Sequence, residues 1–84
     1  MAFTYILYSK NLTRYYIGST DTSLEDRLKK HLSDHSGFTG KAKDWIVVYS
    51  ECHIDKTDAM RKERQIKSWK SRVKIEELIA TQIH

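Results

Sequence analysis

The segment Phe3–Tyr8 constrains the fold most, because hydrophobic side chains occupy both of its faces. Apart from Leu7, its residues are aromatic or β-branched, which favours an extended strand. A strand that is apolar on both faces needs cover on both sides, so we predict that it is the central strand of a sheet. In a chain of 84 residues, one such sheet with helices packed on it accounts for the single core that this length allows.

The next segments predict a β-hairpin followed by a helix. Ser9–Arg14 has no apolar periodicity and predicts a turn, after which Tyr15–Gly18 resumes the strand pattern. Thr22 followed by Glu25 is a capping-box signature, so a helix should begin near Ser23. Its apolar stripe consists of Leu24, Leu28 and Leu32.

The second half of the chain predicts a third strand and further helices. Ser33–Asp44, with Gly37 and Gly40, indicates a loop, and Trp45–Ser50 indicates a short, buried strand. A helix should then run from an N-cap at Thr57 to Trp69 or Lys70, and a last helix from about Ser71 carries Ile75, Leu78, Ile79 and Ile83. The predicted class is α/β (α+β) in the order β-β-α-β-α-α, with a three-stranded, mainly antiparallel sheet flanked by helices.

Composition limits the organisation and the compartment. The chain has no proline and no low-complexity stretch, so residues 1–84 should form one domain. The longest apolar run, Trp45–Tyr49, is far shorter than a membrane span, and the N-terminal residues lack the features of a secretion signal. The single cysteine, Cys52, cannot form an intramolecular disulfide. We therefore expect a soluble, cytoplasmic protein with no membrane partner.

Positive charge is concentrated in one part of the chain. From Lys56 to Lys74, eight basic residues stand against Asp58 and Glu63, whereas the rest has seven basic and nine acidic residues. Such segregation suggests a surface that faces a polyanion, because clustered lysine and arginine displace counterions from a phosphate backbone. The alternative is an ordinary solvated helix face.

Glu63 is the least expected residue of the second predicted helix. The apolar face of that helix comprises Ala59, Met60, Ile66 and Trp69, and Glu63 falls in its middle. A carboxylate there needs compensation for lost hydration. It is therefore a metal ligand, half of an ion pair with an arginine of the first helix, or a boundary residue that water reaches.

Other polar groups supply the rest of a possible phosphodiesterase site. The hairpin carries tyrosines at positions 5, 8, 15 and 16, and Arg27 and His31 leave one edge of the first helix together. Cleavage of a phosphodiester needs a base, a cation for the phosphoryl oxygens and a carboxylate that anchors a divalent metal. Tyrosine, arginine, histidine and glutamate supply these groups, although each residue taken alone has an ordinary structural explanation.

The motifs follow one another in the order Tyr5-Ile6-Leu7, Tyr16-Ile17-Gly18, Arg27-Leu28-Lys29-Lys30-His31 and Arg61-Lys62-Glu63-Arg64-Gln65-Ile66-Lys67. This order and spacing resemble the GIY-YIG nuclease superfamily, especially its small stand-alone bacterial members related to the N-terminal nuclease domain of the excision-repair endonuclease. The resemblance extends from Thr4 to about Ile79. It implies a metal-dependent endonuclease that acts on DNA, with a connection to DNA repair.

The resemblance also implies roles for individual residues. Tyr5 and Tyr16 are the tyrosines of the two motifs, Arg27 binds the scissile phosphate, His31 follows one turn later, and Glu63 is the sole protein ligand of a catalytic divalent metal. Tyr5, Tyr16 and His31 are all candidates for the general base that activates water. The chain departs from the pattern at Thr4-Tyr5, where the namesake has Gly-Ile-Tyr, in a longer interval before Arg27, and in lacking an asparagine after the metal-binding helix.

A lone carboxylate suits Mg²⁺, which keeps most of its waters, and Mn²⁺ should substitute. The residues expected to hold duplex or branched DNA by its backbone phosphates are Lys62, Arg64, Lys67 and Lys70. The alternative function is a nucleic-acid-binding module with the same fold and little activity of its own, and a protein partner for targeting is compatible with either function. A zinc site from His31, His35, Cys52 and His53 is a minor alternative, because the chain has no Cys-x-x-Cys spacing.

Overall fold

The computed structural model describes residues 1–33 and 42–82. Most of the predicted loop, with Gly37 and Gly40, lies outside these ranges, as does Ile83. The elements are β1 (Ala2–Ser9), β2 (Arg14–Thr20), α1 (Leu24–Ser33), β3 (Ile46–His53), α2 (Lys56–Ser68) and α3 (Arg72–Ala80). The predicted order and the α+β class are confirmed.

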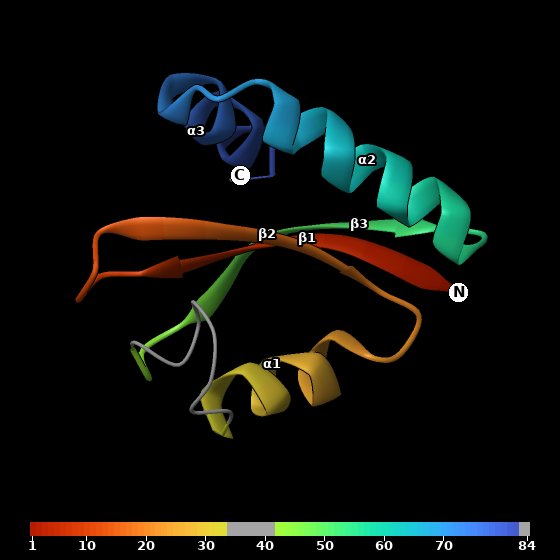
Figure 1. Ribbon diagram of the computed structural model, residues 1–84, viewed down its shortest axis with the longest axis horizontal. Coiled ribbons are helices and arrows are strands. Elements are labelled where there is room, and N and C mark those ends of the chain that lie inside the picture. The colour runs from red at the N-terminus through yellow and green to blue at the C-terminus, as the bar shows by residue number, and fades with distance from the viewer. Residues whose placement is uncertain (34–41, 83–84) are drawn as a thin grey trace.

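The sheet is the middle layer of three. Within the described ranges it has the strands β2, β1 and β3 in that order, both pairings antiparallel. Figure 1 shows α2 and α3 covering one face of the sheet and α1 covering the other. The central position predicted for the first strand is confirmed, since β1 lies between its two neighbours.

Each face of β1 contributes to its own hydrophobic cluster. Toward α1, Tyr5 and Leu7 pack with Trp45 and with the leucine stripe Leu24, Leu28 and Leu32. Toward α2 and α3, Ile6 packs with Ile17, Tyr49 and Ile66. Alternate residues of β1 point to opposite faces, so this strand supports both sides of the molecule.

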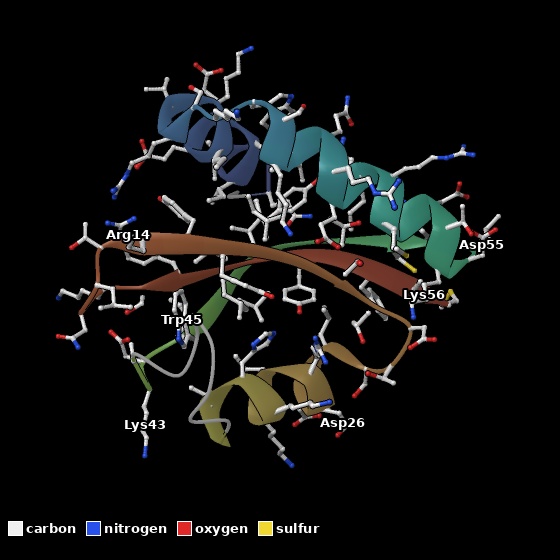
Figure 2. The ribbon with its side chains drawn as sticks, in the orientation of Figure 1. Arg14, Asp26, Lys43, Trp45, Asp55 and Lys56 are labelled. Atoms are coloured by element: carbon white, nitrogen blue, oxygen red, sulfur yellow. The ribbon has the colours of Figure 1, made fainter. Side chains whose placement is uncertain are left out.

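The third strand differs from the prediction. It begins after Trp45 and continues to His53, and it is an edge strand whose Ile46 is 55% exposed rather than a buried strand. Trp45 itself is 2% exposed and packs below the sheet on the α1 side (Figure 2). A short apolar run does not distinguish an edge strand from a central one, and here the buried tryptophan supplied much of the apolar signal.

The outer edge of β3 is covered by a side chain. The Gln82 amide nitrogen donates to the Ser50 carbonyl at 2.5 Å, and the Ser50 N–H donates to the Gln82 amide oxygen at 3.2 Å. The amide thus pairs with the strand as a neighbouring peptide group would, which blocks this part of the edge to pairing with a further strand.

The structure differs from the sequence prediction at the N-caps of α1 and α2 and in the exposure of Met60. α1 is capped by Ser23, whose hydroxyl accepts a backbone N–H three residues on, whereas Thr22 bonds Thr20. The N-cap of α2 is Asp55 and not Thr57, because the chain turns into the helix directly after β3 and the Asp55 carboxylate is already in place. Met60 is 36% exposed, so it is not part of the buried face of α2.

A buried hydroxyl fixes α2 on the sheet. Thr4 is fully buried, and its hydroxyl donates to the Ala59 carbonyl at 2.7 Å. The His53 Nε2 atom lies 3.2 Å from the same oxygen. Thr4 therefore connects the central strand, the end of β3 and the first turns of α2. No helix among the described residues is long and apolar enough to cross a membrane.

We predict that Thr4→Val lowers the free energy of unfolding by about 1 kcal/mol, the usual net value of one hydrogen bond, because valine keeps the shape of threonine without its hydroxyl. Thermal denaturation measures the loss as a fall in Tm of several degrees. Thr57→Val, on the exposed first turn of α2, is the matched control and should leave Tm nearly unchanged. Equal Tm values for the two variants would contradict this role of Thr4.

Candidate active site

The register of the hairpin places the motif tyrosines on one face of the sheet. Tyr5 of β1 lies opposite Gly18 of β2, and Leu7 lies opposite Tyr16. Since residues two apart share a face, Tyr5 and Tyr16 both project toward α1. Tyr5 is 1% exposed, whereas Tyr16 is only half-buried.

Gly18 makes room for the Tyr5 ring. A Cβ atom at Gly18 would lie 2.5 Å from the Tyr5 hydroxyl oxygen and 2.7 Å from the ring carbon that bears it. These separations are well inside van der Waals contact, so the ring crosses the backbone of β2 where a side chain is missing. The sequence indicated Gly18 only as part of a motif, and its steric role becomes clear from the cross-strand register.

The Tyr5 hydroxyl is the centre of a buried hydrogen-bond network. It lies 2.9 Å from Nε2 of His31, and it accepts a hydrogen bond from Nε of Arg27 at 3.3 Å. His31 is 7% exposed and presents its ring edge-on to both tyrosines, at centroid distances of 5.9 Å from Tyr5 and 5.0 Å from Tyr16. The structure thus brings together Tyr5, Tyr16, Arg27 and His31, which the sequence analysis selected.

The network gives the Tyr5 hydroxyl both a hydrogen-bond donor and a possible proton acceptor. Arginine only donates, so Arg27 occupies an acceptor site of the phenol oxygen. The hydrogen of a neutral Tyr5 can be donated to Nε2 of His31 when that nitrogen carries no proton. Burial raises the pKa of Tyr5, the Arg27 hydrogen bond and charge oppose this, and the net pKa is above the ordinary value. Tyr5 is therefore a neutral phenol at pH 7.

Arg27 supplies a positive charge next to the Tyr5 hydroxyl. Its hydrogen bond to Tyr5 raises its pKa, and this effect outweighs partial burial, so the guanidinium stays charged. Arg27 also lines a pocket of about 340 Å³ formed by the end of β2 and the start of α1. Lys30 and Thr20 line the same pocket. The sequence did not indicate them as site residues, because only the folded structure shows that they lie beside Arg27.

Glu63 lies across the edge strand from this network. Its carboxylate accepts a hydrogen bond from the Ser19 hydroxyl at 2.6 Å and from the Lys67 ammonium at 2.6 Å. Ser19 directly follows Gly18 in β2. The alternative of an ion pair with an arginine of the first helix is thus wrong, because the partners are a lysine of the same helix and a strand hydroxyl.

The position of Glu63 is partly open to water. Its side chain is 21% exposed, so the expected middle of an apolar face is in fact the boundary of the core. Burial raises the pKa of Glu63, but the hydrogen bonds from Lys67 and Ser19 and the charges of Lys67 and Arg64 outweigh it, and the net pKa is below the ordinary value. The negative charge of Glu63 in turn raises the pKa of both Tyr5 and Arg27. Glu63 therefore interacts electrostatically with Tyr5 and Arg27 across β2, although other influences on their pKa values are larger.

Glu63 has the properties of a single-carboxylate ligand for Mg²⁺. It is ionised and reached by solvent, and its present partners are an exposed lysine and a hydroxyl. Among residues 1–33 and 42–82, no group of three or more histidine, cysteine, aspartate or glutamate side chains gathers as a metal cluster. A hydrated Mg²⁺ that shares substrate phosphate oxygens needs only one or two protein carboxylates, so the residue fits.

Other candidates from the sequence lie elsewhere. Tyr8 and Tyr15 are paired with their rings 4.9 Å apart, and the Tyr15 hydroxyl donates to Glu76 on the α3 side. The zinc alternative has little support, since His31 bonds Tyr5 on the α1 side while His53 contacts Thr4 on the α2 side. His35, its fourth candidate ligand, lies outside the described residues.

Of the basic residues predicted to hold DNA, Lys62, Arg64 and Lys67 lie on α2, and Lys70 follows its C-cap. Lys62 is half-buried, and Arg64, Lys67 and Lys70 are exposed. Arg64 and Lys67 act electrostatically on Glu63, and Lys67 and Lys70 line a pocket between the hairpin and α3.

Comparison with known proteins identifies the class. Residues 1–76 match the family model of the GIY-YIG catalytic domain, so the chain belongs to the GIY-YIG family, whose members are nucleases. The tyrosines of both motifs and the glycine of the second lie together in the structure. Tyr5 and Tyr16 both contact His31, and Gly18 makes room for the Tyr5 ring.

A solved relative covers nearly the whole chain. The solution NMR structure of the UPF0213 protein BH0048 from Bacillus halodurans is 30% identical, with a TM-score of 0.60, and the match covers 98% of this chain and 86% of that one. No curated protein matches the sequence.

We predict that Gly18→Ala displaces the Tyr5 ring and lowers the free energy of unfolding by about 1 to 3 kcal/mol, the usual cost of overpacking. In a Tyr5→Leu background the same change should be much cheaper, because the atoms that the new methyl group meets are gone. A double-mutant cycle by denaturant unfolding measures this coupling. Additive effects of the two substitutions would show that the ring and the glycine do not constrain each other.

Glu63→Gln should change stability by less than about 1 kcal/mol, because Lys67, 51% exposed, remains hydrated after the partner charge is removed. The lowered pKa of Glu63 means that its ionised form stabilises the fold above pH 4.5, and that this contribution is lost as the pH falls through the folded-state pKa. The small advantage of the wild type should therefore vanish in acid. Unfolding at pH 7 and pH 3 checks this, and a loss of several kcal/mol at pH 7 would instead indicate a structural ion pair.

Proposed function

We propose that the chain is a divalent-metal-dependent endonuclease that hydrolyses DNA phosphodiester bonds. The observation that carries the proposal is the buried Tyr5, His31 and Arg27 network, which lies across one strand from the ionised carboxylate of Glu63. This set supplies a proton acceptor, a cation for phosphoryl oxygens and a metal-anchoring carboxylate. A cytoplasmic location and a role in DNA repair belong to the same proposal.

Tyr5 and His31 act together as the base. Nε2 of His31 lies 2.9 Å from the phenol oxygen, so transfer of the Tyr5 proton to an unprotonated Nε2 would leave a phenolate oxygen that can take a proton from the attacking water. The Arg27 N–H bonds the same oxygen and stabilises its negative charge. Because Tyr5 is buried and its pKa is raised, this acceptor depends on both neighbours. Tyr16, more exposed, faces the approaching substrate and contacts the His31 ring.

Arg27 and Glu63 have different electrostatic roles, one toward the phosphate and the other toward the metal ion. Arg27 stays charged beside an open pocket, where it can bind the oxygens of the scissile phosphate. Glu63 would hold one Mg²⁺ or Mn²⁺ ion, which when bound neutralises charge on the phosphate as the leaving oxygen departs. Lys67, which now bonds Glu63, is then available to the DNA backbone together with Lys62, Arg64 and Lys70.

We predict that Tyr5→Phe lowers the rate of DNA cleavage about 100-fold or more, the usual value of a general acid-base group, while DNA affinity changes little. Only the hydroxyl is removed, so the ring still fills its place in the core. The measurement is single-turnover cleavage of plasmid and branched DNA with Mg²⁺ or Mn²⁺, beside a binding titration in EDTA.

Tyr8→Phe is the matched control, because this hairpin tyrosine lies on the opposite face from His31, paired with Tyr15. Wild-type rates for Tyr5→Phe would remove Tyr5 from the mechanism. If the wild-type chain binds DNA but cleaves none of these substrates with either metal, the alternative function as a nucleic-acid-binding module is favoured.

A further inference from the structure

A pocket separate from the tyrosine network opens on the other face of the sheet. It has a volume of about 600 Å³, within the range of small-ligand sites, and lies between the hairpin turn, the end of α2 and the start of α3. Its apolar wall consists of Leu12, Ile17, Ile66 and Ile75. We call it the hairpin pocket.

The rim of the hairpin pocket is basic. Arg14, Lys67, Lys70 and Arg72 all line it, and no acidic side chain of the described residues does. Lys67 and Arg72 are compensated by Glu63 and Glu76, respectively. Arg14, at the hairpin end of the sheet in Figure 2, and Lys70 have no ion-pair partner in the part of the chain that the structure describes. An occupant should therefore combine an apolar body with negative charge.

The backbone around the hairpin pocket is strained. Among residues 1–33 and 42–82, the non-glycine residues with positive φ are Thr13, at 54°, and Lys70, at 47°, and both line this pocket. Glycine is favoured in such conformations, and Lys70 follows the C-cap of α2, where glycine is common. Backbone strain of this kind concentrates at ligand sites.

The hairpin pocket is also held in shape before any ligand arrives. Arg72 donates from its guanidinium to the Thr13 carbonyl at 3.0 Å, which ties α3 to the hairpin turn. The same guanidinium lies over the Tyr15 ring, 5.3 Å from its centroid. A preformed site loses less entropy on binding than one that must be assembled.

The hairpin pocket adjoins the proposed metal ligand. Lys67 lines the pocket and bonds Glu63. Along β2, Ile17 lines the pocket, and Ser19, two residues on and so about 7 Å further along a strand, donates to Glu63. That step is comparable with the separation of neighbouring phosphates in an extended nucleic-acid strand. A strand whose phosphate lies at Glu63 and Arg27 can thus place its next nucleotide in the pocket.

We infer that the hairpin pocket is a subsite for one unpaired nucleotide beside the scissile phosphate, an inference that rests on the proposed function. The base lies against the apolar wall, and the adjoining phosphates meet Arg14 and Lys70. A base held in a duplex is stacked and paired, so it reaches a pocket only when it is unpaired or extruded. The pocket therefore favours DNA that is unpaired on one side of the cut.

The experiment is an NMR titration of the wild-type chain in EDTA with a thymidine trinucleotide and with the same trinucleotide lacking its central base. The intact probe should shift the methyl signals of Ile17 and Ile75 and bind about tenfold more tightly, as expected for one buried base. Equal affinities, or shifts confined to α1, would overturn the inference.

Lys70→Gly removes one rim charge and relieves the positive φ, so it should weaken binding of the intact trinucleotide several-fold while Tm stays level or rises. Lys74→Ala removes the same charge from an exposed position of α3 that does not line the hairpin pocket, and it should change affinity less than twofold. Equal losses in the two variants would show a diffuse charge effect and contradict the subsite.

Cleavage assays separate this inference from the proposed function. A chain that cuts DNA but shows no pocket shifts with the trinucleotide is a nuclease without this subsite. A chain whose pocket binds the intact trinucleotide selectively, but which cuts nothing with Mg²⁺ or Mn²⁺, retains the subsite and loses the proposed activity.

Discussion

The close approach of the Tyr5 ring to the backbone of Gly18 is the contact on which the site depends. It requires the cross-strand pairing of these residues, and it leaves no room for a Cβ atom. A slip of one residue in the hairpin would turn Tyr5 to the opposite face, away from Arg27 and His31. The hairpin register, the glycine and the hydrogen-bond network are therefore parts of one constraint.

The edge position of β2 explains how residues from both faces of the sheet form one site. At an edge, groups on the two faces are separated by a single strand, and Glu63 beside Ser19 influences Tyr5 and Arg27 from the other side. Burial and the Glu63 charge both hold Tyr5 protonated, while Arg27 opposes them. Neutralising Glu63 would remove one of the influences that keep the phenol from losing its proton.

Local patterns in the sequence predicted the parts of the site that lie within one element. The spacing of Arg27 and His31 and the leucine stripe follow from helical periodicity, and both side chains do reach Tyr5. The partners of Glu63 could not be predicted, because Ser19 meets it only through the packing of α2 on β2. The predicted N-cap of α2, Thr57, is wrong for a similar reason. Aspartate and threonine both favour the N-cap position, and the choice between Asp55 and Thr57 depends on where β3 ends.

The two edge strands of the sheet differ in whether other groups of the described residues pair with their outer backbone, and this difference bears on function. At β3 the Gln82 amide pairs with the backbone of Ser50 and covers part of the strand. At β2 no strand among the described residues pairs with the outer edge. An open edge invites unwanted pairing unless it is short, polar or charged, and β2 is polar at its ends, with Arg14 at the hairpin and Ser19 and Thr20 at the other end. The hairpin pocket, Glu63 and the pocket at Arg27 follow one another along this strand. A strand or side chain paired with the outer edge of β2 would obstruct all three, so an edge without such a partner among the described residues leaves them accessible to one extended polyanion.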